Sequence, residues 1–354
     1  MSASLGTRAK AALVRTLFAL PEPARRHLAG PPLRIDGQEL ALDAQLAIRL
    51  KNRSGSDVFA GAVEQARARY DGLPQIIGYE PPAPVTAREI VIPARHGQLP
   101  ATLYCPADAP QPSGLLVYYH GGGFTVGSRS SHEPVARFLA HQAGVRVLSV
   151  EYRRAPEHPF PAAVEDAITA FEYAHRQAAE LGSDPGRVAV GGDSAGGNLA
   201  AVTAQQAVLT GGAVPAFQLL MYPPTDLSTR RPAYDLFAQG STMTAENFKW
   251  ALGHYVPPEV DLADPRLSPL CGEVTGLPPA YVAGAGFDPL RDDAVAYAGK
   301  LRAGGIPATL SLQTDLPHAY LNFVGLGGRF AEAGVEAARA LASGLRVAEP
   351  AESR

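Results

Sequence analysis

Short apolar runs alternate with longer amphipathic runs from residue 115 to the C-terminal part of the chain. The apolar runs predict strands at residues 115–119, 145–150, 188–190, 217–221, 281–283 and 309–312. The amphipathic runs predict helices over residues 131–143, 161–181, 195–210, 289–303 and 329–343. Nearly all-apolar strands are typical of a parallel sheet covered by helices on both faces, so the pattern predicts an α/β fold.

Three segments depart from this alternation. Residues 1–75 have helical patterns broken by prolines and no strong strand pattern. After a proline-rich linker at residues 81–84, the runs 89–92 and 101–104 flank a turn at His96-Gly97 and predict an antiparallel hairpin. Residues 224–278 are rich in proline and aromatic residues. They predict an insertion at the carboxyl end of a strand, where α/β folds place their sites.

The composition is that of a globular protein large enough for a sizeable core, with 354 residues, 46% hydrophobic and 18% charged. The net charge of −3 does not indicate a nucleic-acid partner. No apolar run approaches the roughly 20 residues of a membrane span, so we expect no stable membrane insertion and place the protein in the cytoplasm. Cys105 and Cys271 lie far apart. A disulfide between them stays open, and we expect buried free thiols.

An amphipathic stretch near the N-terminus has two interpretations. Four apolar residues share one helical face, with basic residues nearby: Leu13, Val14, Leu17 and Phe18. The pattern fits a membrane-surface helix or part of a signal peptide. Because the stretch is short, is interrupted by Arg15 and lacks a small-x-small cleavage site, we expect a helix packed on the protein itself.

The most specific local motif is Gly192-Asp193-Ser194-Ala195-Gly196, a G-x-S-x-G pattern between a predicted strand and a predicted helix. In that context the pattern indicates a nucleophile elbow, a sharp turn that exposes the serine hydroxyl above the sheet. The flanking glycines are needed because a side chain would clash where the helix turns back beside the strand. Ser194 is therefore the candidate nucleophile.

Three consecutive glycines, residues 121–123, follow the predicted strand 115–119. They could form a flexible turn. Because glycines cost backbone entropy and let N–H groups approach a substrate oxygen, we favour an oxyanion hole. Gly122, Gly123 and Ala195, the residue after the serine, are its expected N–H donors. The ring of His120 is expected to order this loop.

Asp288 and His318 are the candidate acid and base. Asp288 follows a predicted strand and precedes Pro289, so it could simply cap a helix. Its place at a strand end also suits a carboxylate that orients an imidazole, better than Asp292 or Asp293 a turn later. His318 follows the last predicted strand and completes the order Ser, Asp, His of α/β-hydrolases. The other histidines fit that order worse. Such a site needs no metal or cofactor, and no metal-binding motif is present.

The chain resembles the hormone-sensitive-lipase family of α/β-hydrolases, the bacterial family IV carboxylesterases. The resemblance covers about residues 85–345 and rests on long motifs in the family's order: residues 120–124, 151–161, 192–197, 226–228, 264–270 and 288–293. It implies an α/β-hydrolase fold with an eight-stranded, mostly parallel sheet flanked by helices and a helical cap. On that division, residues 1–75 are an N-terminal cap segment, 76–223 and 279–354 the catalytic core, and 224–278 the cap insertion.

The resemblance also implies the activity. Family members hydrolyse esters of short to medium acyl chains without a cofactor, so the expected partner is a small-molecule ester, and many are homodimers. One position departs from the family: His318-Ala319-Tyr320 stands where His-Gly-Phe is usual. Tyr320 could place a hydroxyl near the acyl or alcohol pocket. Phe124 and Tyr152 are expected to line or support the pocket, although each could equally be core packing.

Two other functions stay open at this point. Some relatives are plant hormone receptors that kept the fold but lost the histidine, whereas His318 is present here. An amidase or peptidase would use the same Ser, His and Asp groups. Turnover of a p-nitrophenyl ester, compared with the p-nitroanilide of the same acyl group, separates the esterase from the amidase.

Overall fold

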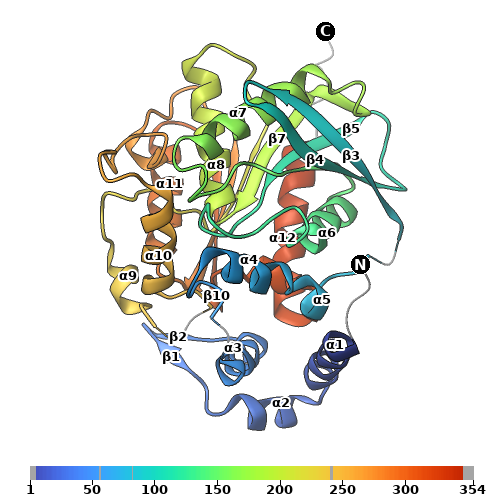
Figure 1. Ribbon diagram of the computed structural model, residues 1–354, viewed down its shortest axis with the longest axis vertical. Coiled ribbons are helices and arrows are strands. Elements are labelled where there is room, and N and C mark those ends of the chain that lie inside the picture. Colours follow the sequence, from blue (N-terminus) through green and yellow to red (C-terminus); the bar gives the residue numbers. More distant parts are fainter. Residues whose placement is uncertain (1–4, 56, 82, 240–241, 346–354) are drawn as a thin grey trace, which may run out of the picture.

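A sheet of eight strands forms the centre of the protein (Figure 1). The structure is a computed structural model, and it describes residues 5–55, 57–81, 83–239 and 242–345. The strands are β3 (Val85–Ala94), β4 (Gly97–Pro106), β5 (Ser113–Tyr119), β6 (Arg146–Val150), β7 (Ser183–Asp193), β8 (Gln218–Met221), β9 (Ala280–Phe287) and β10 (Ala308–Pro317). Their order across the sheet is β10-β9-β8-β7-β5-β6-β4-β3. Every pairing from β10 to β6 is parallel, while β4 pairs antiparallel with both β3 and β6. The prediction of an eight-stranded, mostly parallel sheet is confirmed.

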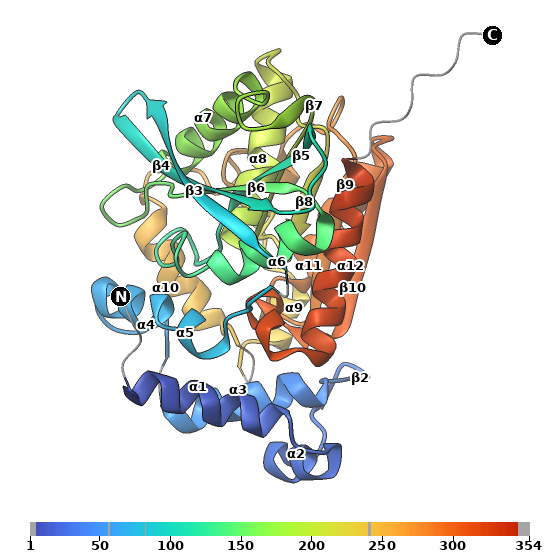
Figure 2. The ribbon, with the colours of Figure 1, turned by 90° about the vertical axis from the view of Figure 1, so that its right-hand side faces the viewer.

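Helices cover both faces of this sheet (Figures 1 and 2). On one face lie α7 (Ala162–Arg176), α8 (Ala195–Leu209) and α11 (Arg291–Ala303), and on the other lie α6 (Glu133–Ala143) and α12 (Gly328–Gly344). In β5, Leu115 and Val117 belong to the hydrophobic core on the α8 face of the sheet. Leu116 and Tyr118 belong to the core on the α12 face. Because successive side chains of a strand point to opposite faces, this all-apolar strand is buried on both sides.

The N-terminal segment is mainly helical, as expected. It contains α1 (Leu5–Phe18), α2 (Glu22–Ala29), α3 (Leu42–Ser54), α4 (Val63–Asp71) and α5 (Pro74–Ile77). The segment has no strong strand pattern in the sequence, yet β1 (Arg34–Ile35) and β2 (Gln38–Glu39) form a small antiparallel hairpin. Its turn is Asp36-Gly37, and both residues have positive φ. Asp-Gly is a typical sequence for that tight turn, and it was the signal we overlooked.

The amphipathic stretch near the N-terminus packs on the protein. Helix α1 contacts α5, and Phe18 packs against the core on the α12 face. Leu13 on the same helix is 58% exposed, so only part of its apolar face is covered. None of the described helices is long and apolar enough to cross a membrane.

The segment between β8 and β9 contains α9 (Pro232–Leu236), α10 (Ala245–Tyr255) and the 3₁₀ turn η1 (Pro269–Cys271). A second 3₁₀ helix, η2 (Tyr320–Leu326), follows β10. Helix α10 begins with a capping box, in which the Thr244 and Asn247 side chains each accept the other residue's backbone N–H. The Asn247 side chain also donates to the Asp57 carboxylate of the N-terminal segment at 3.0 Å. The two cysteines are free thiols, as expected, but Cys105 is only partly buried and Cys271 is exposed.

Candidate active site

Ser194 occupies the sharp turn between β7 and α8. Its φ of +53° is uncommon for a residue with a side chain, and strained backbone of this kind clusters at functional sites. The turn needs glycine on both sides: a Cβ on Gly192 or Gly196 would lie 2.3 or 1.8 Å from the carbonyl oxygen of Tyr119. The Ser194 side chain is nearly enclosed, and the residue is 8% exposed.

The structure brings Ser194, His318 and Asp288 into one hydrogen-bonded line. The Ser194 Oγ lies 2.9 Å from His318 Nε2, and His318 Nδ1 lies 2.7 Å from Asp288 Oδ2. Both partners are buried, with 3% and 0% of their surface exposed. With the Nδ1 proton donated to Asp288, Nε2 is free to accept the serine proton. The three groups come from the ends of β7, β9 and β10, which meet at one edge of the sheet.

Asp288 also accepts the N–H of Leu290 at 2.8 Å, but it does not cap the helix, because the N-cap residue of α11 is Leu290 and no side chain caps that helix. Helix α11 begins at Arg291, two residues later than predicted. The next two carboxylates serve other contacts. Asp292 accepts the N–H of Ala233 at 2.9 Å, and Asp293 accepts the N–H groups of Thr225 and Asp226. Both hold the segment that follows β8, a role that the sequence did not suggest.

The glycine loop lies directly beside the elbow. Gly122 has a φ of +118°, and a Cβ there would lie 2.2 Å from the Val126 carbonyl oxygen. A Cβ on Gly123, at φ +60°, would lie 2.5 Å from Cβ of Ala251 in α10. A side chain at either position would collide with a neighbouring residue, so the loop requires glycine there. Ala195 is the first residue of α8, immediately after Ser194.

The Asp193 side chain links the glycine loop to the elbow. Its carboxylate accepts the Tyr118 hydroxyl and the Gly121 N–H, the latter at 2.9 Å, and lies 3.5 Å from His132 Nε2. Burial opposes ionisation of Asp193, but His132 and these donors outweigh it and lower the pKa of the carboxyl. Although Asp193 and Gly121 lie in motifs, this buried network was not predicted from the sequence, because the contacts of Asp193 with Tyr118 and His132 depend on tertiary packing.

The ring of His120 supports the loop, as expected. Its Nδ1 lies 2.8 Å from the Gly121 carbonyl oxygen, and the ring stacks on Tyr152 at 4.2 Å. Burial, and after it the neighbouring His132, lower the pKa of His120 well below its ordinary value, so the ring is neutral near pH 7.

The three aromatic residues predicted near a pocket are all buried. The Tyr152 hydroxyl donates a hydrogen bond to the His120 carbonyl oxygen at 2.8 Å. The Phe124 ring stacks on the Tyr255 ring with their centroids 3.9 Å apart. Both residues therefore support the glycine loop. The Tyr320 side chain is fully buried, and it does not line the cavity that is described below. The Tyr320 ring points into the core on the α12 face, where its centroid lies 5.0 Å from the centroid of the Tyr222 ring.

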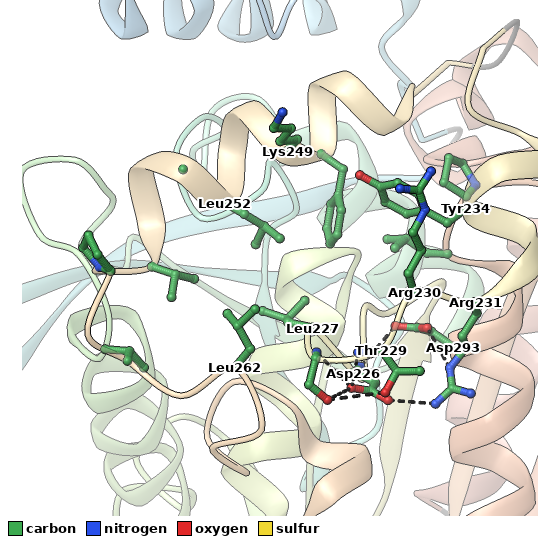
Figure 3. Close-up of a pocket in the computed structure, with 18 of the residues that line it drawn as sticks. Asp226, Leu227, Thr229, Arg230, Arg231, Tyr234, Lys249, Leu252, Leu262 and Asp293 are labelled. Carbon is green, nitrogen blue, oxygen red and sulfur yellow. Dashed lines mark hydrogen bonds and ion pairs between the residues drawn. The ribbon is translucent and has the colours of Figure 1, made fainter.

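A cavity of about 530 Å³ lies beside the candidate site, between the segment after β8, helix α10 and the start of α11 (Figure 3). Its wall is largely apolar and includes Leu227, Leu252 and Leu262. At one end Arg231 pairs with Asp226 at 2.8 Å and with Asp293 at 3.3 Å. Pro289 and Leu290 line the cavity directly after Asp288, whereas Ser194 and His318 do not. Burial raises the pKa of Asp293 to about 7, against the opposing effect of its backbone hydrogen bonds and Arg231.

Comparison with known proteins identifies the class. A family model described as the alpha/beta hydrolase fold matches residues 116–322. Carboxylic ester hydrolase LipN of Mycobacterium tuberculosis is 42% identical over 89% of this chain and 86% of that protein. Ethyl acetate hydrolase of Pseudomonas putida is 38% identical over 75% of this chain and 83% of that protein.

Solved structures agree with these relatives. Ester-hydrolase EH1AB1 from the metagenome of Lake Arreo has a TM-score of 0.82 at 35% identity, covering 86% of this chain and 98% of its own. A thermostable esterase from Pseudomonas putida ECU1011 has a TM-score of 0.83 at 29% identity, covering 87% and 98%. The chain therefore belongs to the hormone-sensitive-lipase family of α/β-hydrolases. It is a carboxylesterase.

Proposed function

We propose that the protein hydrolyses esters of short to medium acyl chains through a covalent acyl-enzyme on Ser194. The observation that carries this proposal is the buried line of Ser194, His318 and Asp288, with spacings of 2.9 and 2.7 Å. A serine hydroxyl is a weak nucleophile near pH 7 and needs an adjacent base, which His318 Nε2 supplies.

Acylation proceeds in two transfers. The Ser194 Oγ attacks the ester carbonyl carbon while its proton moves to His318 Nε2, and the carbonyl oxygen becomes an oxyanion. The N–H groups of Gly122, Gly123 and Ala195 stabilise that charge. The intermediate then expels the alcohol, which takes the proton from His318 and leaves the acyl group on Ser194. Asp288 keeps the ring in the required tautomer and stabilises the imidazolium.

Deacylation repeats the sequence with water. His318 Nε2 takes a proton from a water molecule as that oxygen attacks the acyl carbon, and it returns the proton to Ser194 Oγ as the carboxylic acid leaves. The proposed cycle uses only three side chains and three backbone N–H groups, and it therefore needs no cofactor. The helices α1–α5 and the segment between β8 and β9 are the proposed cap, which selects the ester.

The direct test is turnover of p-nitrophenyl esters from acetate to palmitate by the wild-type protein and by Ser194→Ala. We expect the wild type to hydrolyse the shorter esters and Ser194→Ala to be inactive with its fold intact. Butyryl p-nitroanilide should be a much poorer substrate than p-nitrophenyl butyrate. Activity that is independent of Ser194, or that favours the anilide, would contradict the proposal.

A further inference from the structure

Helix α4 of the N-terminal segment packs against residues 125–132, which follow the glycine loop. Arg67, Tyr70 and Asp71 follow the three- and four-residue spacing that places side chains on one helical face. The Tyr70 ring stacks on His132 with centroids 5.9 Å apart, and Asp71 accepts the Ser128 hydroxyl at 2.7 Å. Tyr70 also forms a small apolar cluster with Ala66 and the fully buried Val126. This face of α4 therefore contacts the stretch 125–132 that continues from the glycines.

Arg67 makes the most specific of these contacts, because one guanidinium reaches three separate acceptors. Its Nε donates to the Thr125 carbonyl oxygen at 2.9 Å, and its Nη2 donates to the Ala155 carbonyl oxygen at 2.8 Å. Nη1 and Nη2 each donate to the Glu157 carboxylate at 2.7 Å. A planar fork with five donors can satisfy this arrangement, whereas the single ammonium of lysine cannot.

Thr125 is the closing residue of the turn that begins at Gly122. The N–H groups of Thr125 and Val126 both donate to the Gly122 carbonyl oxygen, at 3.1 and 2.9 Å. The Gly122 carbonyl shares a planar trans peptide unit with the Gly123 N–H, so fixing the oxygen also fixes the direction of that N–H. A contact that holds Thr125 thus acts on an expected donor of the oxyanion hole.

We propose that Arg67 is a positioning residue that sets the direction of the Gly123 N–H through Thr125. The N-terminal segment then contributes to the chemical step, in addition to covering the site. This inference rests on the proposed esterase function. It concerns a residue that contacts neither the ester nor the triad, and its effect is on the stabilisation of the oxyanion rather than on substrate capture.

The test compares Arg67→Lys and Arg67→Ala with Arg187→Ala in the full chain. Arg187 is a matched control, since it is also a partly buried arginine in an ion pair, with Asp184 at 3.2 Å, at the opposite end of β7. Active sites are counted by complete reaction with a p-nitrophenyl phosphonate, and kcat per counted site and KM are measured with p-nitrophenyl butyrate. A merely structural role would lower the number of reactive sites without changing kcat per site.

We expect both Arg67 variants to lose about tenfold to a hundredfold in kcat per counted site, with KM changed by less than about threefold. Arg67→Lys keeps the charge and the fold but should not restore kcat. Arg187→Ala should match the wild type. Wild-type kcat per site in Arg67→Lys, an equal loss in Arg187→Ala, or a loss confined to KM would each overturn the inference. Absence of ester turnover in the wild type would instead refute the proposed function.

Discussion

The two sides of Ser194 are held in different ways. On the base side, Asp288 and His318 follow directly from β9 and β10, so paired strands of the central sheet place them. On the side of the proposed oxyanion hole, the Asp193 carboxylate accepts the Gly121 N–H, and Arg67 of the N-terminal segment donates to the carbonyl oxygen of Thr125, which follows the glycine loop. The proposed base side thus depends mainly on strand pairing, whereas the proposed oxyanion side also depends on a contact with the N-terminal segment.

The largest effect is expected on the base side, from Asp288→Asn. An amide at this position favours the wrong imidazole tautomer, and the loss in kcat should be about 10⁴-fold. The matched control is Asp292→Asn, because Asp292 contacts Ala233 and Arg291 instead of the histidine. Steady-state kinetics on p-nitrophenyl butyrate checks the pair. Near-full activity in Asp288→Asn with a large loss in Asp292→Asn would mean that the orienting acid is wrongly assigned.

Removal of residues 1–40 should disturb both sides of the site, because this segment contacts β10 and Arg291 as well as α5. The deletion takes away α1, which packs on α5, and Asp36 and Arg25, which pair with Arg291 and Asp43. We expect kcat/KM on p-nitrophenyl butyrate to fall about tenfold or more. Full activity of the shortened chain would show that this segment is dispensable.

Tyr320→Phe distinguishes core packing from a pocket role. The Tyr320 hydroxyl is buried and has no hydrogen-bond partner among the residues that the structure describes. An unpaired buried hydroxyl destabilises a fold, so the variant should equal the wild type in stability or exceed it by about 1 kcal/mol. Urea unfolding and a p-nitrophenyl ester series check this. A change in acyl-chain preference would return Tyr320 to the substrate pocket.

The smallest effect concerns Glu157. The hydrogen bond from Arg67 is the main cause that lowers the pKa of Glu157 from 4.5 to about 2. A carboxyl with a lowered pKa stabilises the fold above its ordinary pKa, and that contribution is lost as the pH falls from 4.5 toward about 2. The Tm of Glu157→Gln should be slightly below that of the wild type near pH 7, and the difference should shrink on acidification. A difference that is constant with pH would contradict this.

The same contrast explains how much could be predicted from the sequence. Alternating apolar and amphipathic runs located the six parallel strands and their helices, because those elements depend on local patterns. Ser194, Asp288 and His318 could be proposed because each follows a strand in a characteristic order. Arg67 could not, since its acceptors lie 58 to 90 residues away and no local pattern marks the contact. The buried position of Tyr320 could not be predicted, because the direction of a side chain after a strand depends on tertiary packing.

The most direct test of the account is covalent labelling with a p-nitrophenyl phosphonate, followed by mass spectrometry of the digested protein. A phosphonate reacts with the activated serine, releases p-nitrophenol and stays bound to Oγ as a mimic of the tetrahedral intermediate. The account predicts one phosphonyl group per chain, on the peptide that contains Ser194, and no label in Ser194→Ala. A label on another residue, or unchanged labelling of Ser194→Ala, would contradict it.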